Sequence, residues 1–352
     1  MSAADRAPRL LLIRTSALGD VVHSLPVAVA LRRALPQARL GWVIEEAFAP
    51  LVTGHVDEVI PVRLRGWRHA PLAAPTRREV RRAVRSLRAF RADVAVDLMG
   101  SHKSGLLALL SGAPRRLGAR RADRREPSSA AWIDQPVALA GTHAVDRALS
   151  LVAPLGVTAL AADFAGERIP PHPAATAAAQ RLDPAAAQVL IQPGAAWGNK
   201  RYPPAWWGEV AVRIAAGAAG ACGVLAGPGE EPLAAAVVAA SRGAARPLHA
   251  PALPTLVAAL RDARLVLGGD TGPLHLAHAL GTPVLAVMGP TDPARHGPYG
   301  APERALWRRL PCSFCYKRFG ETKACLLEIP PSLVAAHALS SLRSASPSPP
   351  PL

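Results

Sequence analysis

The sequence is poor in several features that mark particular classes of protein. It has 4 cysteines in 352 residues, too few for the disulfide framework of a secreted protein. Aromatic residues make up only 4% of the chain, whereas hydrophobic residues make up 50% and can fill sizeable cores. No apolar run reaches the roughly 18 residues of a membrane span, and the first residues lack the apolar stretch of a signal peptide. We therefore expect a cytoplasmic globular protein whose length favours two domains.

Acidic residues are also scarce relative to basic ones. The chain has 25 Asp and Glu against 41 Lys and Arg, a formal net charge of +16, and residues 63–125 alone hold 17 Lys or Arg. Within that stretch, residues 77–91 have the period of a helix with one apolar stripe and arginines on its other faces. Such a helix is either a solvated surface or a surface that binds nucleic acid, acidic lipid or a phosphorylated substrate. The sequence carries no nucleic-acid-binding motif that would favour nucleic acid. The charge by itself does not distinguish a solvated surface from a binding surface.

Short apolar segments alternate with helix-like segments along two stretches of the chain. The first series predicts strands over 10–14, 40–45, 58–62 and 93–98 and helices over 21–35, 77–91 and 103–111. The second predicts strands over 189–194, 222–229, 264–270 and 283–290 and helices from about residue 204 and over 230–242, 254–262 and 273–280. Alternation of this kind is typical of parallel sheets, so two Rossmann-like domains are expected. We place domains at 1–165 and 188–335, a Pro- and Ala-rich connection at 166–187, and a helix end with a disordered tail at 336–352.

The loop after the first predicted strand lacks the glycines of a phosphate-binding loop. In TSALGDVVHSLP, residues 15–26, a single glycine, Gly19, is followed by the carboxylate of Asp20. A carboxylate at the end of a strand repels phosphate, so this loop has another purpose.

The second half of the chain has a better candidate for an anion site. In GGDTGPLHLAHALG, an apolar strand gives way to a helix for which Asp270 or Thr271 is a suitable N-cap. The N–H groups and dipole of such a helix favour a diphosphate, although a well-capped turn without a ligand explains the same residues. His275 and His278 lie three residues apart, a spacing more typical of hydrogen-bonded core histidines than of metal ligands.

Two further segments carry groups suited to a nucleotide ligand. QPGAAWGNKRYPP places Lys200 in a loop after a strand, where an ammonium can contact phosphate. GPGEE places Glu230 and Glu231 at another strand end, where a carboxylate can bind ribose or sugar hydroxyls.

These segments together closely resemble glycosyltransferase family 9, the ADP-heptose:lipopolysaccharide heptosyltransferases. The resemblance extends from about residue 9 to 335 and is strongest in GDVVHSLP, QPGAAWGNKRYPP, GPGEE and GGDTGPLHLAHALGTPVLAVMGPTDP. Five other segments favour the heptosyltransferase I branch: WVIEEAFAP, VIPVRLRGWR, DLMGSHKSGLLA, RREP and HAVDR. The resemblance implies an α/β GT-B fold, in which two Rossmann-like domains with parallel sheets face an interdomain cleft. The N-terminal domain would bind the acceptor and the C-terminal domain ADP-heptose.

The resemblance also implies a reaction, an inverting transfer of heptose from ADP-L-glycero-D-manno-heptose to the Kdo of Kdo-lipid A. Asp20 falls on the position of the family's general base. The implied donor-binding residues are Lys200, Glu230, Asp270, Thr271, Gly272 and His275. The implied acceptor-binding residues, suited to carboxylates and phosphates, are Arg65, Arg68, Lys103, Arg125 and Arg147.

The partners follow from the same resemblance. A lysine and a helix N-terminus would stabilise the departing diphosphate, so neither a metal ion nor another cofactor is expected. The remaining arginines would hold the enzyme on the anionic inner leaflet, which predicts a peripheral protein on the cytoplasmic face of the inner membrane. Nucleic acid is not an expected partner.

Three cysteines depart from the best-known heptosyltransferase I sequences and resemble a cluster in other family members, including heptosyltransferase II-like proteins: Cys312, Cys315 and Cys325. We interpret them as reduced structural thiols rather than as a zinc site, because no fourth ligand has clear spacing among His296, His337 and Cys222.

The mixed signature leaves the acceptor open between Kdo and a first heptose, and the donor open to another nucleotide sugar. Two alternatives come from other classes. A non-catalytic nucleic-acid-binding protein would explain the charge, and a dehydrogenase would explain paired Rossmann-like domains but lacks the GxGxxG motif.

Overall fold

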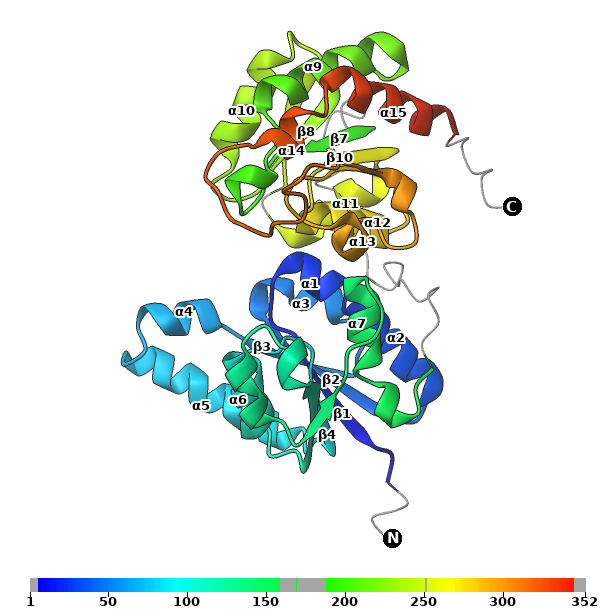
Figure 1. The fold of residues 1–352 in the computed structure, drawn as a ribbon. Helices are drawn as coiled ribbons and strands as arrows, with labels where there is room; N and C mark the ends of the chain where they lie inside the picture. The colour runs from blue at the N-terminus through cyan, green and yellow to red at the C-terminus, as the bar shows by residue number, and fades with distance from the viewer. Residues whose placement is uncertain (1–5, 159–168, 170–187, 251, 345–352) are drawn as a thin grey trace, which may run out of the picture. The chain divides into compact units, whose positions relative to one another are not determined.

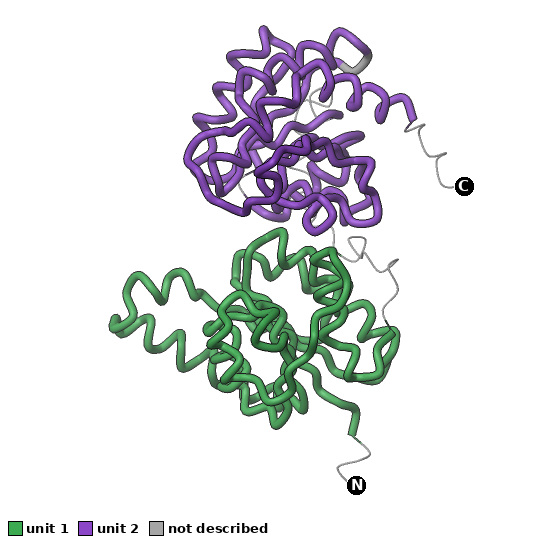
Figure 2. The backbone as a smooth tube through the Cα atoms, viewed as in Figure 1, with its two compact units in different colours: residues 1–170 green, residues 171–352 purple. Residues whose placement is uncertain are grey.

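The computed structural model describes residues 6–158, 169, 188–250 and 252–344. The chain divides into two compact units, residues 1–170 and 171–352 (Figure 2). Apart from Ile169, the predicted connection at 166–187 lies outside the described residues, and so does the end of the predicted tail from residue 345 onward.

Unit 1 is built on a parallel six-stranded sheet in the order β3-β2-β1-β4-β5-β6 (Figure 1). Its strands are β1 (Arg9–Ile13), β2 (Arg39–Glu45), β3 (Glu58–Val62), β4 (Val94–Asp97), β5 (Arg115–Ala119) and β6 (Gln135–Val137). The central strand β1 pairs with β2 and β4 and places Leu12 opposite Trp42 and Val96. All three side chains are fully buried, because helices cover both faces of a parallel sheet.

The helices of unit 1 connect successive strands. They are α1 (Leu18–Val22), α2 (Leu25–Ala34), α3 (Ala49–Val52), α4 (Leu64–His69), α5 (Ala74–Ala89), α6 (His102–Leu110) and α7 (Ala144–Ser150), with short 3-10 turns η2 (Glu46–Phe48), η3 (Arg121–Asp123), η4 (Pro127–Trp132) and η5 (Ala153–Leu155). The prediction of one helix over 21–35 is wrong, because α1 ends at Val22 and α2 begins afresh at Leu25. Pro26 explains the break, since proline fits the first turn of a helix but not its interior.

The arginine-rich helix α5 pairs with α4 in a hairpin that extends from the rest of unit 1 (Figure 1). It begins three residues before the predicted start and buries Ala83 and Leu87, while Val80 and Val84 are half-buried. The predicted apolar stripe is therefore present, and the arginines occupy the exposed faces.

Unit 2 repeats the same topology in the order β12-β11-β10-β7-β8-β9. Its strands are β7 (Val189–Gln192), β8 (Cys222–Ala226), β9 (Ala245–His249), β10 (Leu265–Gly268), β11 (Val284–Val287) and β12 (Ala305–Leu306). Its helices are α9 (Pro204–Ile214), α10 (Glu231–Ala240), α11 (Leu253–Asp262), α12 (Gly272–Ala279), α13 (Pro293–His296), α14 (Ala324–Leu327) and α15 (Pro331–Ser344), with short turns η7 (Gly198–Lys200), η8 (Ala215–Ala219) and η9 (Pro302–Arg304).

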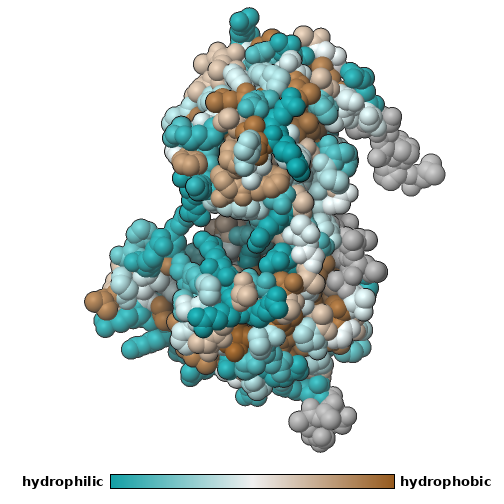
Figure 3. Space-filling model, viewed as in Figure 1, coloured by the Kyte–Doolittle hydropathy of each residue, from teal (hydrophilic) through white to brown (hydrophobic). Residues whose placement is uncertain are grey.

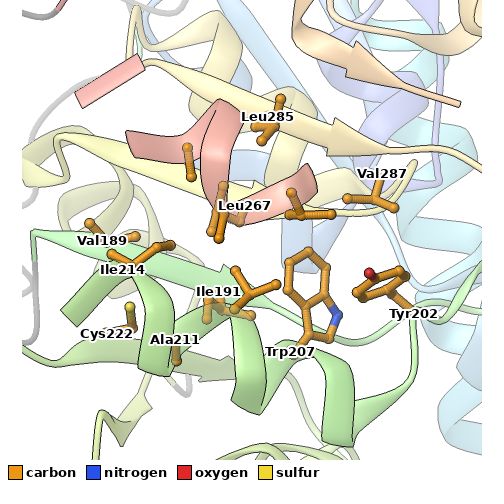
Figure 4. Packing of buried hydrophobic residues seen from close by; sticks show 14 of the residues in the cluster. Val189, Ile191, Tyr202, Trp207, Ala211, Ile214, Cys222, Leu267, Leu285 and Val287 are labelled. Atoms are coloured by element: carbon orange, nitrogen blue, oxygen red, sulfur yellow. The ribbon is translucent and has the colours of Figure 1, made fainter. Parts of the chain in front are cut away.

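The main core of unit 2 lies between its sheet and helices α9 and α15. Ile191, Leu267 and Val287 from three strands surround the ring of Trp207 from α9 (Figure 4). The Tyr202 ring lies 4.9 Å from that of Trp207, and its hydroxyl donates to Ile329 O at 2.6 Å. The predicted α/β class with two Rossmann-like, parallel-sheet units is confirmed, and the predicted cleft between them stays a prediction.

Candidate functional site

Each sheet has one point at which the order of its strands reverses. It lies between β1 and β4 in unit 1 and between β7 and β10 in unit 2. Ligands of open α/β sheets bind outside the carboxyl ends of the strands at such points. Four predicted site residues follow these strand ends: Asp20 after β1, Lys103 after β4, Lys200 after β7 and Asp270 after β10.

Asp20 lies on the short helix α1, with 45% of its side chain exposed. Arg14 Nη2 lies 2.8 Å from Asp20 Oδ1, and the backbone N–H of Ala17 donates to Oδ2 at 3.2 Å. Arg14 is in turn held by a hydrogen bond from Nη1 to the carbonyl of Leu98 at the end of β4. The carboxylate is therefore oriented by its neighbours and still accessible to a ligand. Sequence reasoning missed Arg14, whose only signal was its place directly after the first strand.

The predicted acceptor residues lie on elements that follow β3, β4, β5 and β6, hence at the same edge of the sheet as Asp20. The four exposed ones are Arg65, Arg68, Lys103 and Arg125. Arg147 differs from them, because its side chain is 23% exposed and its Nη2 lies 3.8 Å from Asp123 Oδ1. Its charge is partly balanced within the unit.

Acidic side chains fix the position of α4, which carries two of these arginines. The carboxylate of Glu45, at the end of β2, accepts hydrogen bonds from the N–H groups of Leu64 and Arg65 at 3.2 and 3.3 Å. Trp67 Nε1 donates to Glu79 Oε2 on α5 at 3.0 Å. A carboxylate at a helix N-terminus is a favourable cap, so α4 presents its basic residues from a fixed start.

A fully buried ion pair, which the sequence did not reveal, joins two loops at the edge of the sheet where Asp20 lies. Arg124 Nη2 donates to Asp97 Oδ2, and both side chains are 0% exposed. Asp97 Oδ1 accepts from the N–H groups of Met99 and Gly100 at 2.9 and 3.1 Å, while Arg124 Nε donates to Ser129 Oγ at 2.8 Å. The pair joins the loop before Lys103 to the segment that contains Arg125.

In unit 2, the carboxylate of Asp270 is the centre of a polar cluster. It lies 2.5 Å from Lys200 Nζ and 2.9 Å from His275 Nε2, and it accepts a hydrogen bond from Thr291 Oγ1 at 2.8 Å. Burial alone would raise the pKa of Asp270, but the hydrogen bond from His275 and the Lys200 ammonium hold it far below its usual value. Asp270 is therefore a fixed anion that positions a lysine and a histidine, and Thr291 is a partner that the sequence did not reveal.

The amino end of α12 lies beside this cluster. Thr271, one of the two predicted candidates, is the N-cap, and the helix begins at Gly272, one residue before the predicted start; the Thr271 side chain makes no capping bond. Its buried Oγ1 has no hydrogen-bond partner among the described residues. The first N–H groups of a helix lack intrahelical partners, so this end can donate to an anion.

Glu230 lies at the carboxyl ends of β7 and β8. Its Oε2 accepts from Gln192 Nε2 and from the N–H of Gly227, each at 3.1 Å. A Cβ at Gly194 would lie 2.1 Å from Glu230 Oε1, so the glycine of the QPG segment is required for this carboxylate to fit. Among the described residues Oε1 accepts no hydrogen bond, so it keeps its capacity to accept one from a hydroxyl.

The cysteines do not form a metal centre in the part of the chain that is described. Cys222 belongs to the core of unit 2, and burial raises the pKa of its thiol to about 12. Cys325 is buried, whereas Cys312 and Cys315 are exposed. Across residues 6–158, 169, 188–250 and 252–344, no three His, Cys, Asp or Glu side chains are arranged to hold a metal ion.

Comparison with known proteins decides the family. The model of glycosyltransferase family 9 (heptosyltransferase) matches residues 80–325. Lipopolysaccharide heptosyltransferase 1 of Pseudomonas aeruginosa is 33% identical over 313 residues, which cover 88% of this chain and 86% of that protein. The chain belongs to glycosyltransferase family 9.

Other relatives and structures agree with this family 9 assignment. Lipopolysaccharide heptosyltransferase 1 of Escherichia coli K12 is 29% identical over 300 residues, covering 83% of this chain and 91% of that protein. The E. coli heptosyltransferase WaaC, solved with ADP, superposes with a TM-score of 0.75 and 26% identity over 95% of this chain and 99% of that chain. ADP-heptose lps heptosyltransferase II of E. coli has a TM-score of 0.74 at 20% identity, with 96% and 99% covered, and supports the fold.

The family and the GT-B type of fold predicted from the motifs are thus confirmed, and the chain is a glycosyltransferase. The roles assigned to individual residues stay predictions. None of the helices in the described ranges is long and apolar enough to cross a membrane.

Proposed function

We propose that this family 9 enzyme transfers heptose from ADP-L-glycero-D-manno-heptose to the Kdo of Kdo-lipid A, with inversion and without a metal ion. The relatives named above that are called lipopolysaccharide heptosyltransferase 1 support this choice of reaction. A second structure of WaaC, solved with ADP-2-deoxy-2-fluoro heptose, has a TM-score of 0.73 and 26% identity and supports the choice of donor. The observation that carries the proposal is the place of Asp20, an accessible carboxylate at the strand-reversal point of unit 1.

Asp20 acts as the general base in the proposed mechanism. It accepts the proton of the acceptor hydroxyl while that oxygen forms a bond to the anomeric carbon of heptose. The bond between this carbon and the diphosphate oxygen breaks on the opposite face, and ADP departs with the electron pair. The contacts from Arg14 and Ala17 hold the carboxylate in place without covering it.

The donor is bound by unit 2 in this proposal. Lys200 and the first N–H groups of α12 at Thr271 and Gly272 bind the diphosphate and stabilise the charge that grows on it as the bond breaks. Glu230 accepts hydrogen bonds from ribose hydroxyls through Oε1. His275, held by Asp270, completes the polar wall of the site.

The acceptor and the membrane are bound by unit 1. Arg65, Arg68, Lys103, Arg125 and, more weakly, Arg147 contact the carboxylates and phosphates of Kdo-lipid A. The α4–α5 hairpin lies on an anionic membrane through the exposed faces of α5, and hydrophilic residues cover much of this hairpin in the view of Figure 3. The loop after α4 adds Leu72, which is 83% exposed. We propose that this contact holds the enzyme on the cytoplasmic face of the inner membrane.

Substitution of the base tests the mechanism. Asp20→Asn should reduce turnover with ADP-heptose and a soluble Kdo acceptor by about 10² to 10⁴, the range for loss of a general base, and leave ADP affinity unchanged. Glu58→Gln is the matched control, because it removes a carboxylate at the amino end of β3, away from the strand-reversal point. Activity of Asp20→Asn within tenfold of the wild type would remove Asp20 from this role.

A substrate screen tests the choice of reaction. We expect ADP-heptose to be used in preference to UDP- and GDP-sugars, and a Kdo acceptor in preference to a heptosylated one. Preference for the heptosylated acceptor would indicate a heptosyltransferase II-type activity, and preference for another donor would refute ADP-heptose as the substrate.

A further inference from the structure

Lys200 and the amino end of α12 give the proposed diphosphate site little net positive charge. Lys200 Nζ lies 2.5 Å from Asp270 Oδ2, and the two side chains are only 14% and 9% exposed. The pair therefore brings almost no net positive charge to a diphosphate, which carries several negative charges. The partial charge of the α12 amino end adds about half an elementary charge. A further cation beside this site would therefore strengthen the binding of a nucleoside diphosphate.

One segment of unit 2 covers the loop that contains Lys200. We call residues 311–323 the C-terminal strap. Asn199, 1% exposed, joins the two: its N–H donates to Phe319 O at 3.1 Å and its Nδ2 donates to Lys317 O at 2.9 Å. The fit is close, since a Cβ at Gly198 would lie 1.7 Å from Gly320 O. The strap therefore keeps a fixed position relative to the Lys200 loop.

This contact brings Arg318 of the strap to the same aromatic ring as Lys200. Arg318 Cζ lies 4.7 Å and Lys200 Nζ 4.5 Å from the centroid of the Trp197 ring. The two cations are thus separated by no more than the sum of these distances. Arg318 is exposed, and within the described ranges it has no acidic partner.

Two cations that contact one ring can share an anionic ligand. A face of the indole attracts each cation, while the two cations repel one another. A ligand with two linked phosphoryl groups relieves this repulsion, because it accepts hydrogen bonds from both. A guanidinium is suited to the task, since it donates two parallel hydrogen bonds to one phosphoryl group.

We propose that Arg318 is a second cationic contact for the diphosphate of the donor nucleotide, positioned by Trp197 and the C-terminal strap. The proposal rests on the assignment of the donor site to unit 2. It gives the strap, which contains Cys312 and Cys315 of the three cysteines that depart from the best-known heptosyltransferase I sequences, a place in donor binding.

Calorimetric titration of the full chain with ADP and with adenosine tests the contact. Arg318→Ala should weaken ADP binding about tenfold, the lower end for a charged hydrogen bond because the guanidinium is exposed. Adenosine lacks the diphosphate, so its affinity should not change. Arg318→Lys, which keeps the charge but loses the bidentate geometry, should recover part of the loss. Arg309→Ala is the matched control, because it removes an exposed arginine of unit 2 outside the strap.

Each failure has a distinct meaning. Unchanged ADP affinity in Arg318→Ala, alongside normal binding by the wild type, would overturn the contact and leave the proposed function standing. Equal losses of affinity for ADP and for adenosine in Arg318→Ala would make Arg318 a structural residue. An equal loss of ADP affinity in Arg309→Ala would mean that the effect comes from the overall positive charge of unit 2 and not from a contact of Arg318. Absence of ADP binding by the wild type would overturn both the contact and the donor assignment.

Discussion

The buried ion pair of unit 1 allows a quantitative prediction about stability. In Arg124→Leu, the carboxylate of Asp97 stays buried without its partner, since both side chains are 0% exposed. Removal of one partner from such a pair costs about 3–5 kcal/mol. The variant also deprives Ser129 Oγ and the Ala119 carbonyl of hydrogen bonds of 2.8 and 3.1 Å. We therefore expect Arg124→Leu to lower the free energy of unfolding by an amount in the upper part of this range.

Hydrogen exchange, followed by mass spectrometry on peptides that cover β1, β4 and β5, measures this free energy of unfolding within unit 1. Arg213→Leu is the control, because Arg213 and Glu209 form an i,i+4 pair with side chains 48% and 45% exposed. Such a pair contributes only about 0.3–0.5 kcal/mol.

The double variant Asp97→Leu/Arg124→Leu should cost less than the sum of the two single variants, because it leaves no unpaired buried charge. If Arg124→Leu destabilised unit 1 by less than about 1 kcal/mol, like an exposed pair, the burial argument would be refuted. If the cost of the double variant equalled the sum of the two single costs, the direct interaction between Asp97 and Arg124 would be refuted.

Three further predictions concern the site, its pH dependence and the membrane. Lys200→Ala should weaken ADP-heptose binding and slow transfer together, because in the proposed mechanism the ammonium contacts the diphosphate before and during its departure; unchanged ADP affinity in calorimetry would make Lys200 structural. Burial lowers the pKa of His296 from 6.5 to about 4, so the unfolded chain takes up its proton first as the pH falls. The free energy of unfolding should therefore drop by up to about 3 kcal/mol between about pH 6.5 and 4, and urea titrations of His296→Gln should lack this drop. Replacement of Arg78, Arg82 and Arg85 by glutamine should weaken binding to anionic vesicles by about 1 kcal/mol per residue in a salt-dependent manner, and should leave the KM for a soluble acceptor unchanged; salt-independent binding would refute the membrane role of α5.

The strands at the centre of both sheets were predictable from the sequence, and so was the edge strand β3, whereas the other three edge strands, β6, β9 and β12, were not. β1 and β10 are runs of buried aliphatic residues, which periodicity detects directly. β9, at one edge of its sheet, has the sequence ARPLH with Arg246, Pro247 and His249 exposed. An edge strand faces solvent on one side and tolerates proline, so it lacks the apolar run that marks a strand.

The residues of the candidate site also differ in whether the sequence alone could indicate them. Asp20, Lys200 and Asp270 could be predicted as site residues because each follows an apolar strand within a recognisable motif. Arg14 and Arg318 could not, because the roles proposed for them depend on contacts with Leu98 and Trp197 that no motif of the sequence marks. Pairing between parallel strands and docking of a loop leave no periodic signal in one sequence, so such positions become visible only in the folded chain.

The excess of arginine becomes interpretable once each guanidinium has a location. Arg124 is wholly buried and bonded to Asp97, so its charge contributes to the fold and to no ligand. Arg63 is paired with Glu46 and Glu79 at the base of the α4–α5 hairpin, and these pairs engage two of the few acidic side chains near α5. The arginines on the exposed faces of α5 contribute little to packing, since the helix buries only Ala83 and Leu87. Repulsion among closely spaced like charges on one helix is unfavourable, so an anionic surface that relieves it should bind there more strongly than at the paired arginines of the same unit.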